Sequence, residues 1–368
     1  MNIENLLDKA IKLEELTIDE GLFLYENAPF VNLCSTANKI RQKIHSNNIV
    51  TWQIDRNVNI TNVCIGSCKF CNFHCRIIEK EKAYLTSIEE YRTKIEELIA
   101  QNGDQLLLQG GMHPKLDIVY YENLFRTLKS EFPQIKLHAL GAPEVYHIAK
   151  ISSLDTKTTL QRLMDAGLDS LPGAGAEILD TVIRKELSPM KCSAEDWLRI
   201  MKEAWELGLT TSATMVYGHI ESPRHRIEHL VKIRELQSHK KEDQNGFLAF
   251  IPWPMCINGT KLENHPKLGQ QMNANDHLRI TAISRIMLTN VKNVQASYLT
   301  LGVDIAKQAL NCGANDLGSI MIEENVVSST GVRNIVDAER MQQIITEAGY
   351  IPQLRNQLYQ KREIKNGK

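Results

Sequence analysis

The chain has 368 residues, of which 43% are hydrophobic, and a formal net charge of -1 at pH 7. This length fits one α/β barrel of roughly 250 residues with extensions, and the apolar content is sufficient for a large core. The even charge argues against a dedicated nucleic-acid-binding protein, which usually carries a basic excess. No stretch approaches 18 consecutive apolar residues, so we expect no transmembrane helix and no membrane partner.

The first fifty residues are predicted to be helical. Leu6, Leu7, Ala10 and Ile11 recur near helical spacing, and a further helix is predicted at about Ser35 to His45. This segment is acidic and amphipathic, and it lacks the basic start and apolar core of a signal peptide. We therefore expect a cytoplasmic protein. We expect residues 1–49 to form a helical extension and residues 50–368 to form a barrel with a C-terminal tail.

From Val50 onwards, short apolar runs alternate with amphipathic helices. The helix Ile88–Gln101 has the clearest start, because Ser87 and Glu90 have the spacing of a capping box. The other predicted helices lie around Val119–Lys129, Leu160–Ala166, Ala194–Leu207, Arg224–Gln237, His277–Leu288 and Ile305–Leu310. The eight predicted strands are Val50–Ile60, Gln105–Gln109, Lys136–Leu140, Leu168–Pro172, Thr211–Val216, Phe247–Pro252, Val294–Tyr298 and Asp316–Ile322.

This alternation predicts an α/β fold with a parallel sheet and right-handed crossovers. Eight such units predict a closed (β/α)8 barrel of the TIM type, with its active site at the C-terminal ends of the strands. The polar run at residues 239–245 is expected to be a loop before the sixth strand. The basic tail after Leu354 is expected to pack loosely or fray.

Four of the eight cysteines fall within residues 64–75. Cys64, Cys68 and Cys71 form a C-x3-C-x2-C pattern just after the first strand. Thiolates suit iron–sulfur clusters or zinc, and three cysteines would leave one iron of a 4Fe–4S cluster open to another ligand. Two alternatives remain: Cys75 as a fourth cluster ligand, or His74 and Cys75 completing a zinc site. The remaining cysteines are expected to be small buried residues: Cys34, Cys192, Cys256 and Cys312.

Later strand ends carry groups that are typical of a ligand site. The second strand is followed by Gln109-Gly110-Gly111-Met112-His113-Pro114, in which the glycines allow close backbone approach. The fourth is followed by Pro172-Gly173-Ala174-Gly175-Ala176-Glu177, which lacks the Lys-Ser/Thr of a P-loop. The fifth leads into Tyr217-Gly218-His219-Ile220-Glu221, and the sixth ends in Ile251-Pro252-Trp253-Pro254. Polar and aromatic groups at successive strand ends indicate a binding site.

The cysteine motif after the first strand resembles that of the radical S-adenosylmethionine superfamily. The resemblance implies that Cys64, Cys68 and Cys71 hold a 4Fe–4S cluster whose fourth iron binds S-adenosylmethionine. The reduced cluster would then cleave the cofactor to a 5′-deoxyadenosyl radical. It also implies cofactor contacts for other residues. Phe70 would pack by the adenine, and the Gly110-Gly111 pair would bind the amino group. Glu177 would bind ribose hydroxyls, and Arg184 would either pair with the carboxylate or lie on a solvated helix face.

Longer segments resemble the futalosine branch of menaquinone biosynthesis: DRNVNITNVCIGSCKFCNF, LLLQGGMHP, AGLDSLPGAGAEIL, SATMVYGHIESP, AFIPWP and GANDLGSIMIEENVVSSTG. Two radical enzymes of that pathway share this architecture, aminofutalosine synthase and cyclic dehypoxanthine futalosine synthase. LLLQGG and FIPWP resemble the second. There are two departures: Ala174 stands where the family commonly has glycine, and His74 stands where tyrosine is frequent.

This resemblance implies that the enzyme cyclises dehypoxanthine futalosine. Hydrogen would be abstracted from its ribose at C4′, the carbon radical would add to the benzoate ring, and loss of one electron and one proton would restore aromaticity. The final deprotonation needs a base, for which His219, Asp55 and His113 are candidates, and Gln109 and Trp253 are expected to contact the substrate. The expected partner is a low-potential electron donor such as flavodoxin or ferredoxin. The alternatives are an aminofutalosine synthase and a zinc-stabilised barrel that acts as a binding module.

Overall fold

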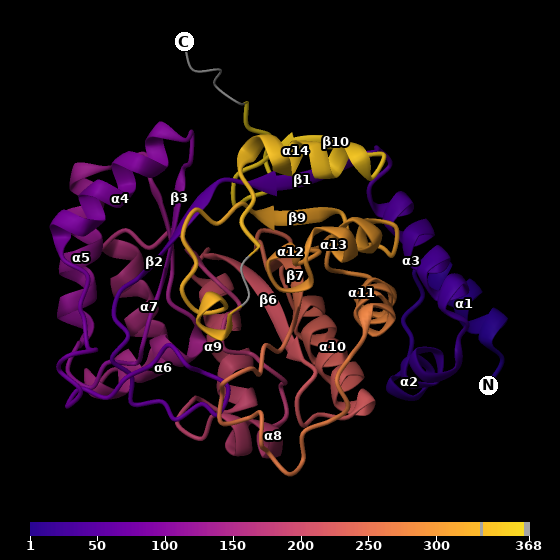
Figure 1. The fold of residues 1–368 in the computed structure, drawn as a ribbon, viewed down its shortest axis with the longest axis horizontal. Helices are drawn as coiled ribbons and strands as arrows, with labels where there is room; N and C mark the ends of the chain where they lie inside the picture. Colours follow the sequence, from indigo (N-terminus) through magenta and orange to yellow (C-terminus); the bar gives the residue numbers. More distant parts are fainter. Residues whose placement is uncertain (332–333, 364–368) are drawn as a thin grey trace.

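The strands of the computed structural model form two parallel sheets that together build a barrel (Figure 1); the structure describes residues 1–331 and 334–363. The seven-stranded sheet has the order β2-β3-β4-β5-β6-β7-β8, and the three-stranded sheet has the order β10-β1-β9. The strands are β1 (Ile49–Gln53), β2 (Asp55–Asn59), β3 (Gln105–Gln109), β4 (Lys136–Ala139), β5 (Ser170–Leu171), β6 (Thr210–Tyr217), β7 (Phe247–Pro254), β8 (Asn293–Val294), β9 (Asp316–Ser319) and β10 (Ile351–Leu354).

The two sheets join at both ends, which closes the barrel. Strands β1 and β2 are separated only by Ile54, so they act as one bent strand. On the other side, a parallel bridge between Gln295 and Asp316 connects the end of β8 to β9, and β9 pairs with β1. The barrel therefore has eight strand positions, which confirms the predicted fold class. Its shortest strands are β5 and β8, which have two residues each, whereas longer strands were predicted there.

Helices cover the outside of the barrel between successive strands (Figure 1). The predicted capping box is present at the start of α4, where the Ser87 backbone N–H donates to the Glu90 carboxylate at 2.7 Å. The helices after the N-terminal segment are α4 (Ile88–Ala100), α5 (Ile118–Glu131), α6 (Ala142–Ile151), α7 (Thr156–Asp165), α8 (Thr181–Leu187), α9 (Ala194–Glu206), α10 (Pro223–Ser238), α11 (Ala274–Met287), α12 (Tyr298–Leu301), α13 (Val303–Leu310) and α14 (Ala338–Glu347). The sequence prediction missed α6, α8, α12 and α14.

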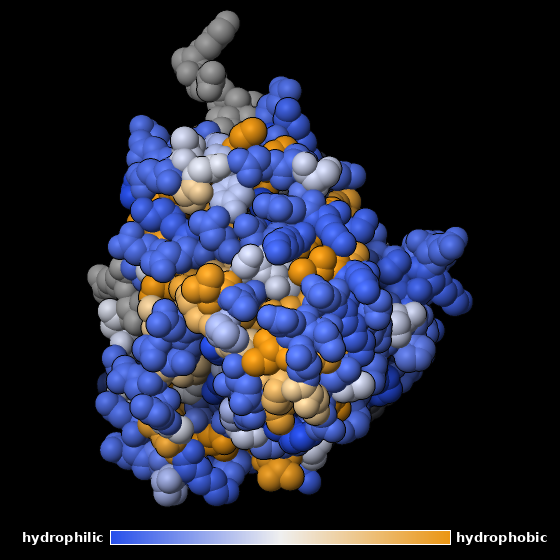
Figure 2. Space-filling model, turned by 90° about the vertical axis from the view of Figure 1, so that its right-hand side faces the viewer, coloured by the Kyte–Doolittle hydropathy of each residue, from blue (hydrophilic) through white to orange (hydrophobic). Residues whose placement is uncertain are grey.

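The N-terminal segment forms α1 (Ile3–Ile11), α2 (Ile18–Asn27) and α3 (Phe30–Ile44), which pack against α10 and α11 on the right of Figure 1. Gly21 allows this contact, because a Cβ there would lie 2.6 Å from the sulfur of Met287. Arg279 of α11 donates to the carbonyls of Tyr25 and Ala28, both at 2.9 Å. Figure 2 shows the outer face of this side, which is mostly hydrophilic with apolar residues in small groups. The division at residue 49 stays a prediction.

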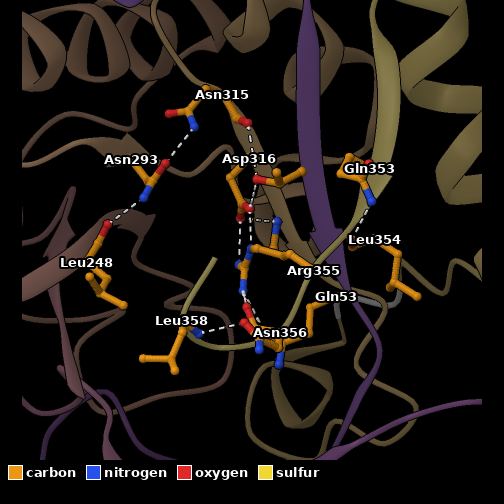
Figure 3. Close-up of polar contacts among 12 residues, drawn as sticks. Gln53, Leu248, Asn293, Asn315, Asp316, Gln353, Leu354, Arg355, Asn356 and Leu358 are labelled. Carbon is orange, nitrogen blue, oxygen red and sulfur yellow. Dashed lines mark hydrogen bonds and ion pairs between the residues drawn. The ribbon is translucent and has the colours of Figure 1, made fainter. Parts of the chain in front are cut away.

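The C-terminal segment is anchored to the barrel at Arg355, which is 4% exposed, so the prediction of a loose tail is wrong at its start. Further along, Leu358, Gln360, Lys361 and Glu363 are exposed. Strand β10 pairs with the outer edge of β1. Directly after it, Arg355 donates to both carboxylate oxygens of Asp316, at 2.7 and 3.0 Å, and to the side chain of Gln53 at 2.7 Å (Figure 3). The charge of Arg355 is thus used internally, by a carboxylate at the start of β9. Residues 364–368 of the tail lie outside the described residues.

Among the described residues, no helix combines the length and the apolar character needed to cross a membrane.

Candidate active site

The three cysteines of the C-x3-C-x2-C motif come together in the loop that follows β2. The thiols of Cys64, Cys68 and Cys71 are close enough to interact electrostatically. A Cβ at Gly66 would lie 3.0 Å from the sulfur of Cys64 and 3.7 Å from that of Cys68. The Cys64 sulfur accepts backbone N–H groups of Gly66 and Met112, both at 3.2 Å. Such N–H···S bonds are one means by which a protein tunes an iron–sulfur cluster.

Cys75 lies beside the motif through its backbone, since its carbonyl accepts the N–H of Cys64 at 3.0 Å, but its thiol has other charged neighbours. Its backbone N–H donates to the carbonyl of Asn62 at 2.9 Å, and its thiol lies near Glu79 and Lys82. Among the residues that the structure describes, no three His, Cys, Asp or Glu side chains are grouped closely enough to ligate a single ion. Three thiols in one loop are a donor set suited to an iron–sulfur cluster. The geometry gives no support to Cys75 as a fourth ligand or to a mononuclear zinc site.

The glycine pair after β3 holds the cysteine loop in place. A Cβ at Gly111 would lie 2.2 Å from the carbonyl oxygen of Val63, and one at Gly110 would lie 2.9 Å from that of Thr61. Glycine is therefore required at both positions so that the backbone can pack against the cysteine loop. We had expected the glycines to leave room for a ligand. The N–H of Gly110 is occupied as well, since it donates to the carboxylate of Glu144 at 3.0 Å.

Glu177 and Arg184 lie side by side in the interior. Glu177 has a positive φ of 39°, and its carboxylate contacts Arg184 at 3.3 Å and Lys191 at 2.7 Å. Arg184 also donates to the carbonyls of Gly175, Ala176 and Cys192, at 2.5 to 3.1 Å. Its guanidinium is therefore used to fasten the loop after β5 to the start of α9. Arg184 is 3% exposed, so it does not lie on a solvated helix face. Its contact with a cofactor carboxylate stays a prediction.

Two charged residues beside the cysteine loop were missed by the sequence reasoning. The ammonium of Lys191 lies 5.5 Å from the ring centre of Phe70 and is attracted by Glu177 and by the Cys68 thiol. The carboxylate of Glu144, on α6, has its pKa raised to about 8 because it is buried, and the charge of Lys191 opposes this rise. Neither residue follows a strand directly, so the strand-end pattern gave no signal for them.

A cavity of about 360 Å³ runs along the barrel lumen from the cysteine loop toward the C-terminal segment. Four of the candidate residues line it: Phe70, Asp55, Gln109 and Trp253. Burial raises the pKa of Asp55 to about 6, while hydrogen bonds from Ser319 and Gln105 partly oppose this. Cys256 also lines the cavity and is only half-buried, in contrast to the expectation of a buried residue. Cys34, Cys192 and Cys312 are buried as predicted.

The two candidate histidines do not line this cavity. His219 is 1% exposed, its Nε2 contacts the carbonyl of Val216 at 3.0 Å, and its Nδ1 accepts the N–H of Ile220 at 2.7 Å. It therefore stabilises the turn after β6. The Nδ1 of His113 accepts the N–H of Lys115 at 3.1 Å, within its own turn. Both histidines make local contacts outside the cavity lining, so the structure does not support their expected role as proton acceptors, which stays a prediction.

Comparison with known proteins agrees with this geometry. The model of the radical SAM superfamily matches residues 58–233, which include the three cysteines, and that of the CofH/MqnC C-terminal region matches residues 244–367. A cyclic dehypoxanthine futalosine synthase of Streptomyces coelicolor is 38% identical over 361 residues, covering 98% of this chain and 88% of that protein. The chain belongs to the radical SAM superfamily. Members use a 4Fe–4S cluster and S-adenosylmethionine, so this chain is a radical SAM enzyme with these cofactors.

Other relatives of this radical SAM enzyme carry two different activity names. A cyclic dehypoxanthine futalosine synthase of Halalkalibacterium halodurans is 39% identical over 360 residues, covering 98% of this chain and 95% of that protein. A 5-amino-6-(D-ribitylamino)uracil–L-tyrosine 4-hydroxyphenyl transferase of Methanocaldococcus jannaschii is 36% identical over 353 residues, covering 94% and 97%. The crystal structure of methylornithine synthase has a TM-score of 0.70 at 20% identity, covering 96% of this chain and 98% of that chain, and supports the fold.

Proposed function

We propose that this radical SAM enzyme cyclises dehypoxanthine futalosine. The observation that carries the proposal is the identity of 38% and 39%, over 98% of the chain, to two cyclic dehypoxanthine futalosine synthases. The cavity in the barrel lumen supports it, because the cavity is of a size suited to a small molecule and combines aromatic and polar walls. The electron donor in this proposal is a low-potential flavodoxin or ferredoxin.

In this proposal Cys64, Cys68 and Cys71 hold the cluster. When bound, the reduced cluster and S-adenosylmethionine supply a 5′-deoxyadenosyl radical that removes a hydrogen atom from the substrate. Lys191 is positioned to attract the carboxylate of the cofactor, since its ammonium lies beside Phe70 and near the Cys68 thiol. Glu144 is a suitable acceptor for the cofactor's amino group, because its carboxylate is buried beside Gly110 and the cysteine loop. These two residues would take over the contacts first expected of the glycine pair, because Gly110 and Gly111 pack against the cysteine loop and the N–H of Gly110 already donates to Glu144. Glu177 would contribute by holding Lys191 in place.

The cavity walls would orient the substrate and exclude water from it, so that a radical meets one C–H bond. Trp253 presents an aromatic surface to the cavity against which a benzoate ring can pack. For the final deprotonation, Asp55 is the one initial candidate that lines the cavity. Because burial raises its pKa to about 6, its carboxylate is a better proton acceptor near neutral pH than an exposed aspartate.

The test is an anaerobic assay of the reconstituted enzyme with S-adenosylmethionine, a reductant and dehypoxanthine futalosine. We expect the cyclic product and 5′-deoxyadenosine in equal amounts, and no turnover of an enolpyruvyl benzoate, which an aminofutalosine synthase would use. A second arm supplies 5-amino-6-(D-ribitylamino)uracil and L-tyrosine, because relatives at 36% identity carry that transferase name. Turnover in the second arm alone would overturn the proposal.

A further inference from the structure

The loop that carries the three motif cysteines lies at the molecular surface. Ile65, Ser67 and Asn72 are exposed in this loop, whereas Cys68 has an exposed fraction of only 8%. The loop therefore has one face toward the solvent and one toward the interior. A protein that delivers electrons to a bound cluster has a short path through this loop, and a short path matters because electron transfer slows steeply with distance.

The loop after β7 packs beside the cysteine loop and reaches the lower edge of the molecule near α8 (Figure 1). The N–H of Leu262 donates to the carbonyl of Lys69 at 3.0 Å, and the side chain of Asn72 donates to the carbonyl of Asn258 at 3.4 Å. The ammonium of Lys69 also contacts Nε2 of His265 at 3.0 Å. The two loops therefore form one continuous surface.

The cluster rim, defined here as residues 65–82 and 258–267, carries an excess of positive charge. It contains six Lys or Arg residues against three Glu residues: Lys69, Arg76, Lys80, Lys82, Lys261 and Lys267, with Glu79, Glu81 and Glu263. The chain as a whole has a formal net charge of -1, so the excess belongs to this part of the molecule.

Three cations of the cluster rim are available to a partner. Lys82 lies 3.9 Å from Glu79, and Lys267 lies 2.8 Å from Glu186 of α8. By contrast, three exposed side chains form no ion pair within the described part of the chain: Arg76, Lys80 and Lys261. Lys261 and His74, which come from the two loops, are close enough for their charges to interact. Exposed charges of one sign attract a partner of opposite sign before contact is made.

The cluster rim also exposes apolar side chains. Ile65, Ile77 and Ile78 are 36%, 36% and 75% exposed. A parallel bridge joins Val63 to Cys75, so the segments that lead to Ile65 and Ile77 begin side by side. Apolar residues with charged residues around them are typical of a surface that contacts another protein.

We propose that the cluster rim docks an acidic electron-carrier protein that holds a low-potential flavin or iron–sulfur centre. The need for such a partner rests on the proposed function, whereas the identity of the substrate does not enter. One electron passes from the reduced carrier to the oxidised cluster, and no bond forms or breaks. A carrier must leave after each transfer, and attraction by exposed charges speeds its arrival without requiring a large apolar interface.

The test measures the rate of cluster reduction in the holoenzyme by stopped-flow absorbance, without added substrate. The rim variant combines Arg76→Glu, Lys80→Glu and Lys261→Glu. The reductants are a reduced acidic flavodoxin and photoreduced 5-deazariboflavin, which is small and uncharged. At low ionic strength we expect the rim variant to react about tenfold more slowly with flavodoxin, and the difference to shrink as salt is added. Its iron content and its reaction with deazariboflavin should match the wild type, which shows that it is folded and loaded.

The matched control makes the same charge change far from the cluster rim. It combines Lys12→Glu, Lys39→Glu and Lys43→Glu, which are exposed in the N-terminal segment, and it should react with flavodoxin like the wild type. The proposal is overturned if the rim variant keeps the wild-type rate, if the control is slowed equally, or if deazariboflavin is slowed as much as flavodoxin.

Two further outcomes would also reject the cluster rim as the docking surface. One is that neither flavodoxin nor an acidic ferredoxin reduces the wild type. The other is that the rim variant changes the oligomeric state, which would assign the surface to a second copy of the chain. Because no substrate is added, failure of the proposed cyclisation leaves the result of this test unchanged.

Discussion

Replacement of Arg355 by methionine should destabilise the whole barrel, although only 13 residues follow it in the sequence. Arg355 is 4% exposed and its partner Asp316 is fully buried. The substitution removes two hydrogen bonds to Asp316, at 2.7 and 3.0 Å, and one to Gln53 at 2.7 Å. Removing one member of a buried ion pair typically costs about 3–5 kcal/mol, because the other charge is left without compensation.

We expect a loss near the lower end of that range, about 3 kcal/mol. The carboxylate of Asp316 would keep two donors, the hydroxyl of Thr51 at 2.5 Å and the N–H of Gly318 at 2.7 Å. Urea unfolding at pH 7, followed by circular dichroism, measures the change. Arg340→Met is the matched control, because Arg340 forms an exposed pair with Glu347 and should unfold like the wild type.

A double variant tests the cause of this loss. When Asp316→Asn is added to Arg355→Met, no uncompensated charge remains, so the double variant should be more stable than Arg355→Met alone. If Arg355→Met unfolds within 1 kcal/mol of the wild type, the buried pair does not secure the C-terminal segment.

Three further predictions concern the site. Alanine at Cys64, Cys68 or Cys71 should abolish the cluster. Cys75→Ala should retain it, because the Cys75 thiol lies near Glu79 and Lys82. Measurement of the iron and sulfide contents of each variant tests this. Lys191→Met should weaken S-adenosylmethionine binding about tenfold at unchanged iron content, with partial recovery in Lys191→Arg; equal affinities would remove Lys191 from the cofactor site. Burial raises the pKa of Asp55 from 3.8 to about 6, so its contribution to stability is present below pH 4 and is lost as pH rises through 6, by roughly 3 kcal/mol. Asp55→Asn should remove this loss from a stability-against-pH profile, and an unchanged profile would contradict the raised pKa.

The alternation of apolar runs and amphipathic helices was sufficient to predict the barrel, because strands such as β2, β6 and β7 are buried along most of their length. It failed where burial depends on polar partners far apart in the chain. Arg355 was assigned to a solvated basic tail, since its partner Asp316 lies 39 residues earlier. Strand β10 was not predicted, because it is stabilised by pairing with β1, which lies about 300 residues earlier in the sequence.

The candidate site shows a similar limit. The cysteine spacing was informative because the three cysteines are close in sequence. The structure places them as neighbours in one loop, and their role as cluster ligands stays a prediction. Position after a strand was a weaker guide. It correctly suggested Gln109 and Trp253 as cavity residues, but it also suggested His219, which is used inside its own turn. Lys191 lies between two helices and reaches the site only through the tertiary fold. Gln53 and Gln105 line the cavity near the starts of β2 and β3, whereas the prediction considered only the C-terminal ends of the strands.

The pairing of β1 with both β9 and β10 has a consequence for synthesis of the chain. Residues 49–53 are made early, but their partners at 316–319 and 351–354 follow only after some 260 and 300 further residues. During translation the backbone N–H and C=O groups at both edges of β1 therefore stay unpaired for a long time, and they can pair with other chains. The outer edge of β1 is covered only once residues 351–354 have been made, so this part of the fold depends on pairing between segments synthesised far apart in time.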